Sequence, residues 1–185
     1  DGRYIVFASG RADISQIWRM DIDGGNQVQL SRGRENRSPH ITFDSRWVVY
    51  TSFDTSAATI WKVPISGGEP VQLTNYESGS LATSPQDGQI AYAYDALDEH
   101  EQPSRRIAFL PLSGGMPGRA VDFVVPPNVS WTADRRALTY IRSLAGVSNI
   151  WDLLDSPVKS LPFKSKRDID DFLCALTPDS RTLFL

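Results

Sequence analysis

The hydrophobic pattern of this chain repeats along its length. The clearest unit spans residues 60–74, where Ile-Trp-Lys-Val-Pro-Ile is followed by Ser-Gly-Gly and, two residues later, by Val-Gln-Leu-Thr. Apolar and β-branched residues on both sides of a glycine pair predict a strand, a tight turn and a second strand. Similar units begin at Ile17, Ile107 and Ile150, although the last one lacks the glycine pair.

A second marker keeps the same period. An Asp-led tripeptide precedes each expected central strand, at Asp1, Asp44, Asp87, Asp134 and Asp179, with intervals of 43 to 47 residues. A period near 40–45 residues with four strands per unit is typical of propeller blades. We therefore expect an all-β fold: a β-propeller of four-stranded antiparallel blades, with about four and a half repeats in this chain.

The second repeat shows how the strands are expected to lie. We predict strands at His40–Phe43, Trp47–Ser52, Thr59–Ile65 and Pro70–Thr74. Residues 47–50 are apolar on both faces, which suits a strand enclosed between two neighbouring blades. The Asp-led tripeptides are predicted to turn the chain into each second strand. The glycine pairs are predicted to close the hairpin between the third and fourth strands, because glycine accepts positive φ at low cost.

One propeller domain is expected over residues 1–185. Its repeats are expected at approximately 1–37, 38–80, 81–127 and 128–170, with a partial fifth at 171–185. The third repeat contains extra residues, and we expect an acidic, solvated loop over 95–103 there. No stretch of normal helix length has a helical period.

Composition narrows the function classes. The chain is 41% apolar and 22% charged, which indicates a globular domain. A net charge of −3 gives no basic footprint, so no nucleic-acid partner is expected. The apolar runs are too short to span a bilayer, so no direct membrane insertion is expected. Cys174 is the single cysteine, which excludes a disulfide within the chain and a cysteine-based zinc cage.

Several turn segments carry a family resemblance. Residues 83–88, 131–134 and 177–180 resemble the "SPDG" turn of TolB-type, WD-repeat-like bacterial β-propellers. Residues 60–74 resemble the second half of the same repeat. Residues 146–151 also resemble propellers found in the C-terminal halves of bacterial kinases and winged-helix regulators.

The resemblance implies a larger ring, because TolB-type propellers usually have more blades than this chain supplies. We therefore expect a piece of a larger ring, or an assembly of two chains, rather than a closed four-bladed ring. Self-association is expected if the ring is incomplete. The resemblance also implies a periplasmic or otherwise extracytoplasmic part of a bacterial protein.

Catalytic chemistry is not predicted. Histidine occurs only at His40 and His100, and no Gly-x-Ser-x-Gly elbow is present. We interpret His40 as a channel-lining or partly buried polar residue. One alternative stays open, since prolyl-oligopeptidase-like serine peptidases carry similar propellers: the chain would then be a gating domain whose catalytic domain is absent from it.

No cofactor is expected, with calcium as the alternative. The spacing of Asp21 and Asp23 matches the first two ligands of a calcium-binding loop, but the later oxygen ligands do not follow at the required spacing. We therefore interpret this segment as a hairpin turn. Asp168, Asp170 and Asp171 lie in a connector expected at the channel mouth, where they would suit calcium.

A non-catalytic binding module is the function that we expect. Loops that enter the inner strands of a propeller converge on one face, where a protein, a peptide or a small ligand would dock. The candidate contacts are Arg37, His40, Glu77, Ser80, Asn128, Asp170 and Asp171. Arg32 and Arg34 extend Arg37 into a basic patch, which is either a solvated loop or a site for an acidic partner. The tryptophans of the repeats are expected in the core.

Overall fold

The computed structural model describes residues 2–55, 57–75, 81–83, 88–97, 100–101, 103–115, 119–122, 129–131, 138–144, 147–152 and 161–162. All regular elements within these ranges are strands, and none is a helix. The chain separates into two compact units, Asp1–Val124 and Val125–Leu185. Each is described by itself.

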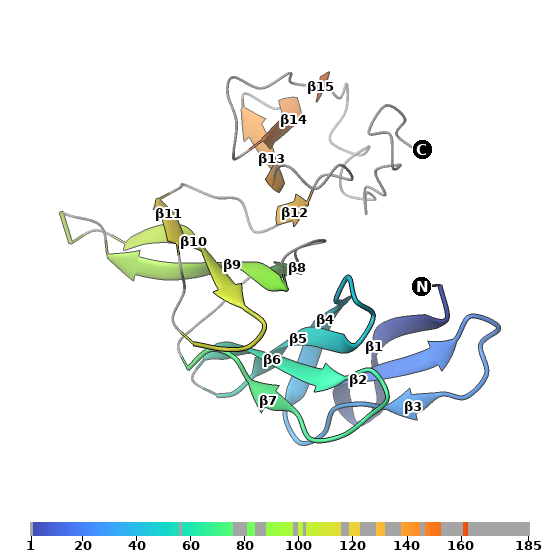
Figure 1. Cartoon of the computed structure of the whole chain (residues 1–185). Coiled ribbons are helices and arrows are strands. Elements are labelled where there is room, and N and C mark those ends of the chain that lie inside the picture. The colour runs from blue at the N-terminus through green and yellow to red at the C-terminus, as the bar shows by residue number, and fades with distance from the viewer. Residues whose placement is uncertain are drawn as a thin grey trace. The chain divides into compact units, whose positions relative to one another are not determined.

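The first unit contains three antiparallel sheets (Figure 1). The first blade consists of β1 (Tyr4–Ala12), β2 (Ile14–Asp21) and β3 (Val28–Gln29). The second blade consists of β4 (Glu35–Ile41), β5 (Trp47–Phe53), β6 (Ala58–Pro64) and β7 (Val71–Gln72). The third blade consists of β8 (Leu81–Thr83), β9 (Gln89–Leu97), β10 (Pro103–Pro111) and β11 (Arg119–Asp122).

The second unit contains a fourth sheet of the same design. It consists of β12 (Val129–Trp131), β13 (Leu138–Leu144), β14 (Val147–Asp152) and β15 (Leu161–Pro162). In all four sheets each strand pairs with its neighbour in sequence, so every sheet is an antiparallel meander. This confirms the predicted all-β class and, in the second, third and fourth sheets, the four-stranded blade, whereas the first sheet has three described strands. The predicted repeat boundaries stay a prediction.

The described glycine hairpins and the turn at Asp44 lie where the sequence predicts them, whereas the other leading aspartates, Asp1, Asp87, Asp134 and Asp179, lie outside the described residues. Gly24, Gly67 and Gly114 each precede the last strand of a blade and have φ values of 86°, 92° and 87°. Ahead of β5, the Asp44 carboxylate accepts hydrogen bonds from the Arg46 amide at 3.1 Å and from a neighbouring threonine hydroxyl. Glycine tolerates positive φ, and aspartate bonds the turn backbone, as the sequence pattern implied.

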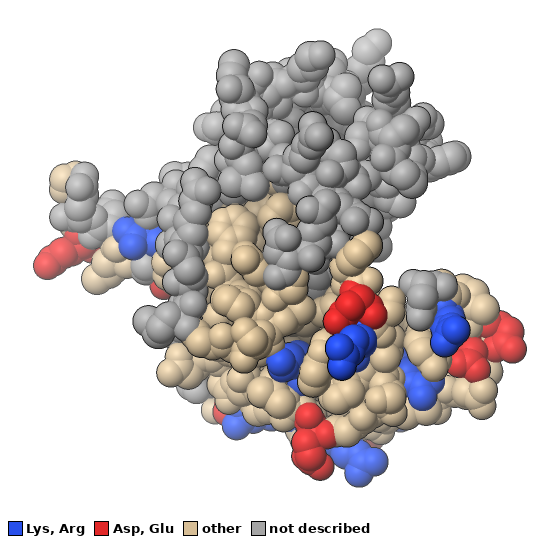
Figure 2. Space-filling model, in the orientation of Figure 1, with Lys and Arg blue, Asp and Glu red and all other residues tan. Residues whose placement is uncertain are grey.

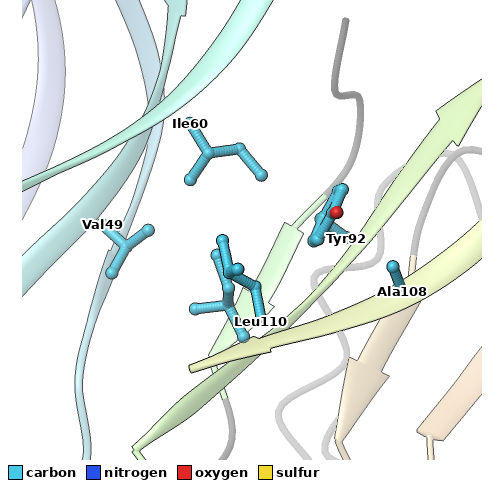
Figure 3. Packing of buried hydrophobic residues seen from close by; sticks show 6 residues of the cluster. Val49, Ile60, Tyr92, Ala108 and Leu110 are labelled. Atoms are coloured by element: carbon cyan, nitrogen blue, oxygen red, sulfur yellow. The ribbon is translucent and has the colours of Figure 1, made fainter. Parts of the chain in front are cut away.

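Strand β5 is buried on both faces, as predicted. Val48 and Tyr50 pack with Ile17 of the first blade, whereas Val49 packs against the third blade. Figure 3 shows Val49 and Ile60 of the second blade pointing toward Tyr92, Ala108 and Leu110 of the third. Alternate side chains of one strand therefore join two separate hydrophobic clusters.

One strand prediction and one loop prediction were wrong in their bounds. Strand β4 runs over Glu35–Ile41 instead of His40–Phe43, because a bulge near Ser38 lets pairing continue past the break in the apolar pattern. Of the acidic loop predicted over 95–103, residues 95–97 and 103 belong instead to strands. Strand β9 continues to Leu97, which pairs with Pro103 of β10.

The repeated tryptophans are not central to the core. Ile17, Ile60 and Ile107 are fully buried, whereas Trp18 and Trp61 are half-buried. Adjacent residues of a strand point to opposite faces, and the large indole with its N–H suits the margin of a cluster better than its centre. Trp61 is an example, because it packs against its cluster while its Nε1 donates to Thr59 Oγ1 at 2.9 Å. The Trp151 side chain lies outside the described residues.

Candidate docking edge of the second blade

In the first two blades, a side-chain hydroxyl directly after the last strand accepts a backbone hydrogen bond from the preceding strand. The Ile60 amide donates to Thr74 Oγ1 at 2.9 Å, and the Leu73 amide donates to the Ile60 carbonyl at 2.8 Å. In the first blade, the Ile17 amide donates in the same way to Ser31 Oγ at 2.8 Å. The Gln-Leu-Ser and Gln-Leu-Thr endings of the first and second repeats therefore fix the outer edges of their blades.

A buried polar network then holds the connector into the second blade. Gln16, Ser31 and Asn36 are each 1–2% exposed. Ser31 Oγ and Asn36 Nδ2 both donate to Gln16 Oε1 at 2.9 Å. Gln16 Nε2 and Asn36 Nδ2 both donate to the Arg34 carbonyl, at 2.8 and 2.7 Å. Since each of these polar groups is satisfied, the network gives the connector a defined backbone position.

Exposed charged and aromatic side chains surround the same connector. Arg34 Nη2 lies 3.1 Å from Asp54 Oδ2, which ties the connector to the hairpin between β5 and β6. Arg37 donates from Nε to Glu35 Oε1 at 2.9 Å, and its guanidinium lies 5.6 Å from the centre of the Phe53 ring. We call these five residues, Arg34, Glu35, Arg37, Phe53 and Asp54, the connector edge.

The charges of the connector edge are paired within the chain. The Asp54 carboxylate accepts a hydrogen bond from the Thr55 amide, and this bond is the largest cause that holds the pKa of Asp54 below its ordinary value. The nearby Arg34 guanidinium is the second cause. On the face that Figure 2 shows, the described basic and acidic side chains are interspersed, with no large area of one sign. The predicted basic patch is thus a set of ion pairs at Arg34 and Arg37, with Arg32 exposed beside them.

A bulge aligns the two described candidate residues. Arg37 lies opposite Thr51 and His40 lies opposite Val49, so β4 contains one extra residue between them, where Ser38 has a φ of 52°. Residues opposite each other share a face of the sheet, so the bulge places Arg37 and His40 on the same face. Strand β4 itself contacts strands of both neighbouring blades.

His40 is half-buried, in agreement with its interpretation as a partly buried polar residue. Burial lowers the pKa of this histidine, so its neutral form is favoured. The sequence interpretation therefore named the correct environment for the side chain.

The other predicted contacts, Glu77, Ser80, Asn128, Asp170 and Asp171, lie outside the described residues, as does Asp168. The sequence interpretation missed Phe53 and Asp54. Their position at the end of a buried strand, beside an Asp-Thr turn, was the available indication.

The predicted turn at Asp21 and Asp23 is present. Asp23 Oδ1 accepts the Gly25 amide at 2.8 Å, and Asp21 Oδ2 accepts Asn26 Nδ2 at 2.6 Å. Within the described ranges, no group of three or more His, Cys, Asp or Glu side chains is placed to hold a metal ion. No helix in that part of the chain is long and apolar enough to cross a membrane.

Comparison with solved structures identifies the fold. TolB from Acinetobacter baumannii superposes with a TM-score of 0.65 and 21% identity, over 88% of this chain and 42% of that chain. A TolB-like protein from Agrobacterium tumefaciens gives a TM-score of 0.53 and 23% identity, over 66% of this chain and 45% of that one. An acylaminoacyl peptidase from Pyrococcus horikoshii gives 0.56 and 11%, over 88% and 30%.

No protein-family model matches the chain, and no curated protein sequence matches it. The chain thus has the TolB-type β-propeller fold that its turn motifs resembled, and it spans less than half the length of either TolB structure. Propellers of this type also occur in a peptidase, so the fold by itself does not decide between binding and catalysis. The resemblance to propellers of kinases and regulators stays a prediction.

Proposed function

We propose that this chain is a non-catalytic propeller module that binds a protein or peptide partner at the connector edge. The observation that carries the proposal is the exposed Arg37–Phe53 stack with its flanking ion pairs, supported by a buried network of satisfied polar groups. Arginine and aromatic side chains are enriched at the centres of protein interfaces. A rigid support lowers the entropy cost of binding, because the contact groups are already positioned.

The chemistry favours a partner that presents carboxylates. The side chains of Arg34 and Arg37 are 51% and 58% exposed despite their ion pairs. Each retains N–H groups that a second carboxylate would accept, and Phe53, 38% exposed, offers an adjacent apolar surface. An acidic peptide with one apolar side chain would satisfy both features.

The test is selection from a random peptide library on the 185-residue chain, followed by affinity measurements on the best peptide. We expect selected peptides rich in Asp and Glu. Replacing Arg37 or Phe53 by alanine should raise Kd at least about tenfold, equivalent to ~1.4 kcal/mol. Arg46→Ala is the matched control, because Arg46 is exposed at the opposite end of β5, and Kd should stay within about twofold.

Two outcomes would contradict the proposal. One is the absence of any enriched peptide. The other is an Arg46→Ala variant that loses as much affinity as Arg37→Ala, since binding would then follow overall charge and not the connector edge.

A second function class is supported by the likeness to the acylaminoacyl peptidase. In that case the propeller would gate a serine peptidase domain outside this chain. A Ser-Asp-His domain in the parent gene would favour this alternative over the first. For either function we propose an extracytoplasmic location in a bacterium, which fractionation of cells expressing the parent gene would test.

A further inference from the structure

Equivalent backbone hydrogen bonds align the second and third blades. The Ile65 amide donates to the Arg46 carbonyl at 2.9 Å, and the Leu112 amide donates to the Gly88 carbonyl at 2.6 Å. In both blades the donor directly follows the third strand and the acceptor directly precedes the second strand. Equal steps along β5 and β9 therefore reach equivalent positions.

The hairpin of the third blade is longer than that of the second blade. Strand β5 ends at Phe53, and the equivalent residue of β9 is Asp95. Strand β9 continues to Leu97, which pairs with Pro103 of β10. A strand rises about 3.4 Å per residue, so the added pairs carry the hairpin about 7 Å further out. Figure 1 shows the paired ends of β9 and β10 extending away from β8.

The end of this longer hairpin is acidic and presents an apolar side chain. Leu97 is 61% exposed, and Glu101 is exposed in the turn. By sequence, residues 97–101 contain three carboxylates and neither lysine nor arginine. The first arginine of β10 is Arg105, which lies nearer the body of the blade, opposite Asp95. We call three exposed residues of this end the hairpin tip: Leu97, His100 and Glu101.

The connector edge has the complementary chemistry. The side chains of Arg34 and Arg37 are 51% and 58% exposed, and Phe53 is 38% exposed. A carboxylate of the hairpin tip would accept hydrogen bonds from these guanidinium groups, and the Leu97 side chain would cover the Phe53 ring. The chain itself therefore contains an acidic segment with one apolar side chain, which is the kind of ligand that suits its connector edge.

The hairpin tip and the connector edge lie at the same end of their blades. Phe53 and Asp54 belong to the hairpin between the second and third strands of the second blade, and the hairpin tip has that place in the third blade. Two copies that face each other with these ends can exchange contacts, each placing its tip on the other copy's connector edge. Such an exchange is isologous, so it closes at two copies.

We propose that the hairpin tip of one copy docks on the connector edge of a second copy of this chain. Complementary charge orients the two copies, and the contact between Leu97 and Phe53 adds apolar burial. Because the tip projects along the direction of its strands, it reaches outward to a partner. This inference rests on the proposed function, since the connector edge is the receiving surface, and it names the chain itself as the partner.

The test is sedimentation velocity of the 185-residue chain over a range of concentrations, at low ionic strength where exposed charges are least screened. We expect reversible association in the micromolar to submillimolar range, with a molar mass that levels off at a dimer. Glu101→Lys and Arg37→Glu should each raise the dissociation constant at least about tenfold. Combining both substitutions restores opposite charges, so the double variant should recover most of the lost affinity.

Glu69→Lys is the matched control for charge. Glu69 is an exposed acid on the hairpin at the opposite end of its blade, so the dissociation constant should stay within about twofold. Leu97→Ser tests the apolar contact without a change of charge, and it should weaken association at least about threefold. Circular dichroism verifies that each variant folds.

Three outcomes would overturn the inference: a wild-type monomer at every concentration, equal weakening by the Glu69 control, or a double variant as weak as the single variants. Peptide selection separates this inference from the proposed function. If selected acidic peptides bind with the expected dependence on Arg37 while the chain stays monomeric, the inference falls and the proposed function stands. If no peptide binds and the chain stays monomeric, both fall.

Discussion

At the scale of single residues, one hydroxyl closes each of the first two blades. Thr74 accepts the amide of the fully buried Ile60 and Ser31 accepts that of Ile17, although the two repeats differ in the residue used. The position therefore selects for an oxygen acceptor of small volume, which explains why the repeats end in Ser or Thr.

Thr74→Val tests this role, because valine keeps the shape and removes the acceptor. A buried amide without a partner should lower the free energy of unfolding by about 1–3 kcal/mol. Urea denaturation measures the change. Thr55→Val, at an exposed turn position, should alter stability by less than about 0.5 kcal/mol, and an equal loss there would argue against the hydroxyl's role.

His40 makes the stability depend on pH. Its pKa is lowered in the folded chain, while the unfolded chain titrates near the ordinary value of 6.5. The unfolded state therefore binds the proton more readily. The contribution of neutral His40 to the free energy of unfolding is fully present above pH 6.5, and it is lost as the pH decreases toward the lowered pKa. His40→Gln should flatten the dependence of the unfolding free energy on pH below 6.5, as measured by urea denaturation at a series of pH values.

At the scale of the elements, the glycine hairpins determine where each third strand ends. Gly67 has a φ of 92° with open space around a hypothetical Cβ, so only the backbone conformation opposes substitution. Gly67→Ala should cost about 1–2 kcal/mol in thermal or urea unfolding. Gly10→Ala is the control, because Gly10 also has open space and lacks positive φ, and its stability should not fall by more than about 0.5 kcal/mol.

Sequence reasoning predicted the elements that depend on local chemistry. The Asp44 turn and the described glycine pairs were predicted because their backbone conformations need particular residues. The start of β4 was missed, since a bulge at Ser38 depends on tertiary pairing with β5 and leaves no apolar alternation. Arg37 and His40 were both named as candidate contacts, but Arg37 was placed in a connector before the strand, whereas it lies with His40 on β4. Phe53 was not named, because a single aromatic residue at a strand end looks like core until its exposure is known.

At the scale of the whole molecule, β5 couples the stability of its two neighbours. Val48 belongs to the cluster shared with the first blade, and Val49 belongs to the cluster shared with the third. Repeat proteins of this kind transmit stability through nearest-neighbour interfaces.

Val48→Ala and Val49→Ala should therefore have similar global costs, about 1–3 kcal/mol each, but different local effects. Hydrogen exchange should accelerate in β1 and β2 for Val48→Ala, and in β9 and β10 for Val49→Ala. Uniform acceleration across all three blades in both variants would show that the interfaces do not behave separately.

The hairpin of β9 and β10 has a consequence for how the gene tolerates change. Beyond the position equivalent to the last pair of β5 and β6, it continues for two more pairs, Ala96 with Ser104 and Leu97 with Pro103. Equal numbers of residues added to both strands at the tip leave the register of every earlier pair, and the face of every earlier side chain, unchanged. Residues can therefore be inserted at this hairpin tip without changing the strand register of the core residues. This makes the tip the natural site for grafting an epitope or a reporter into the chain.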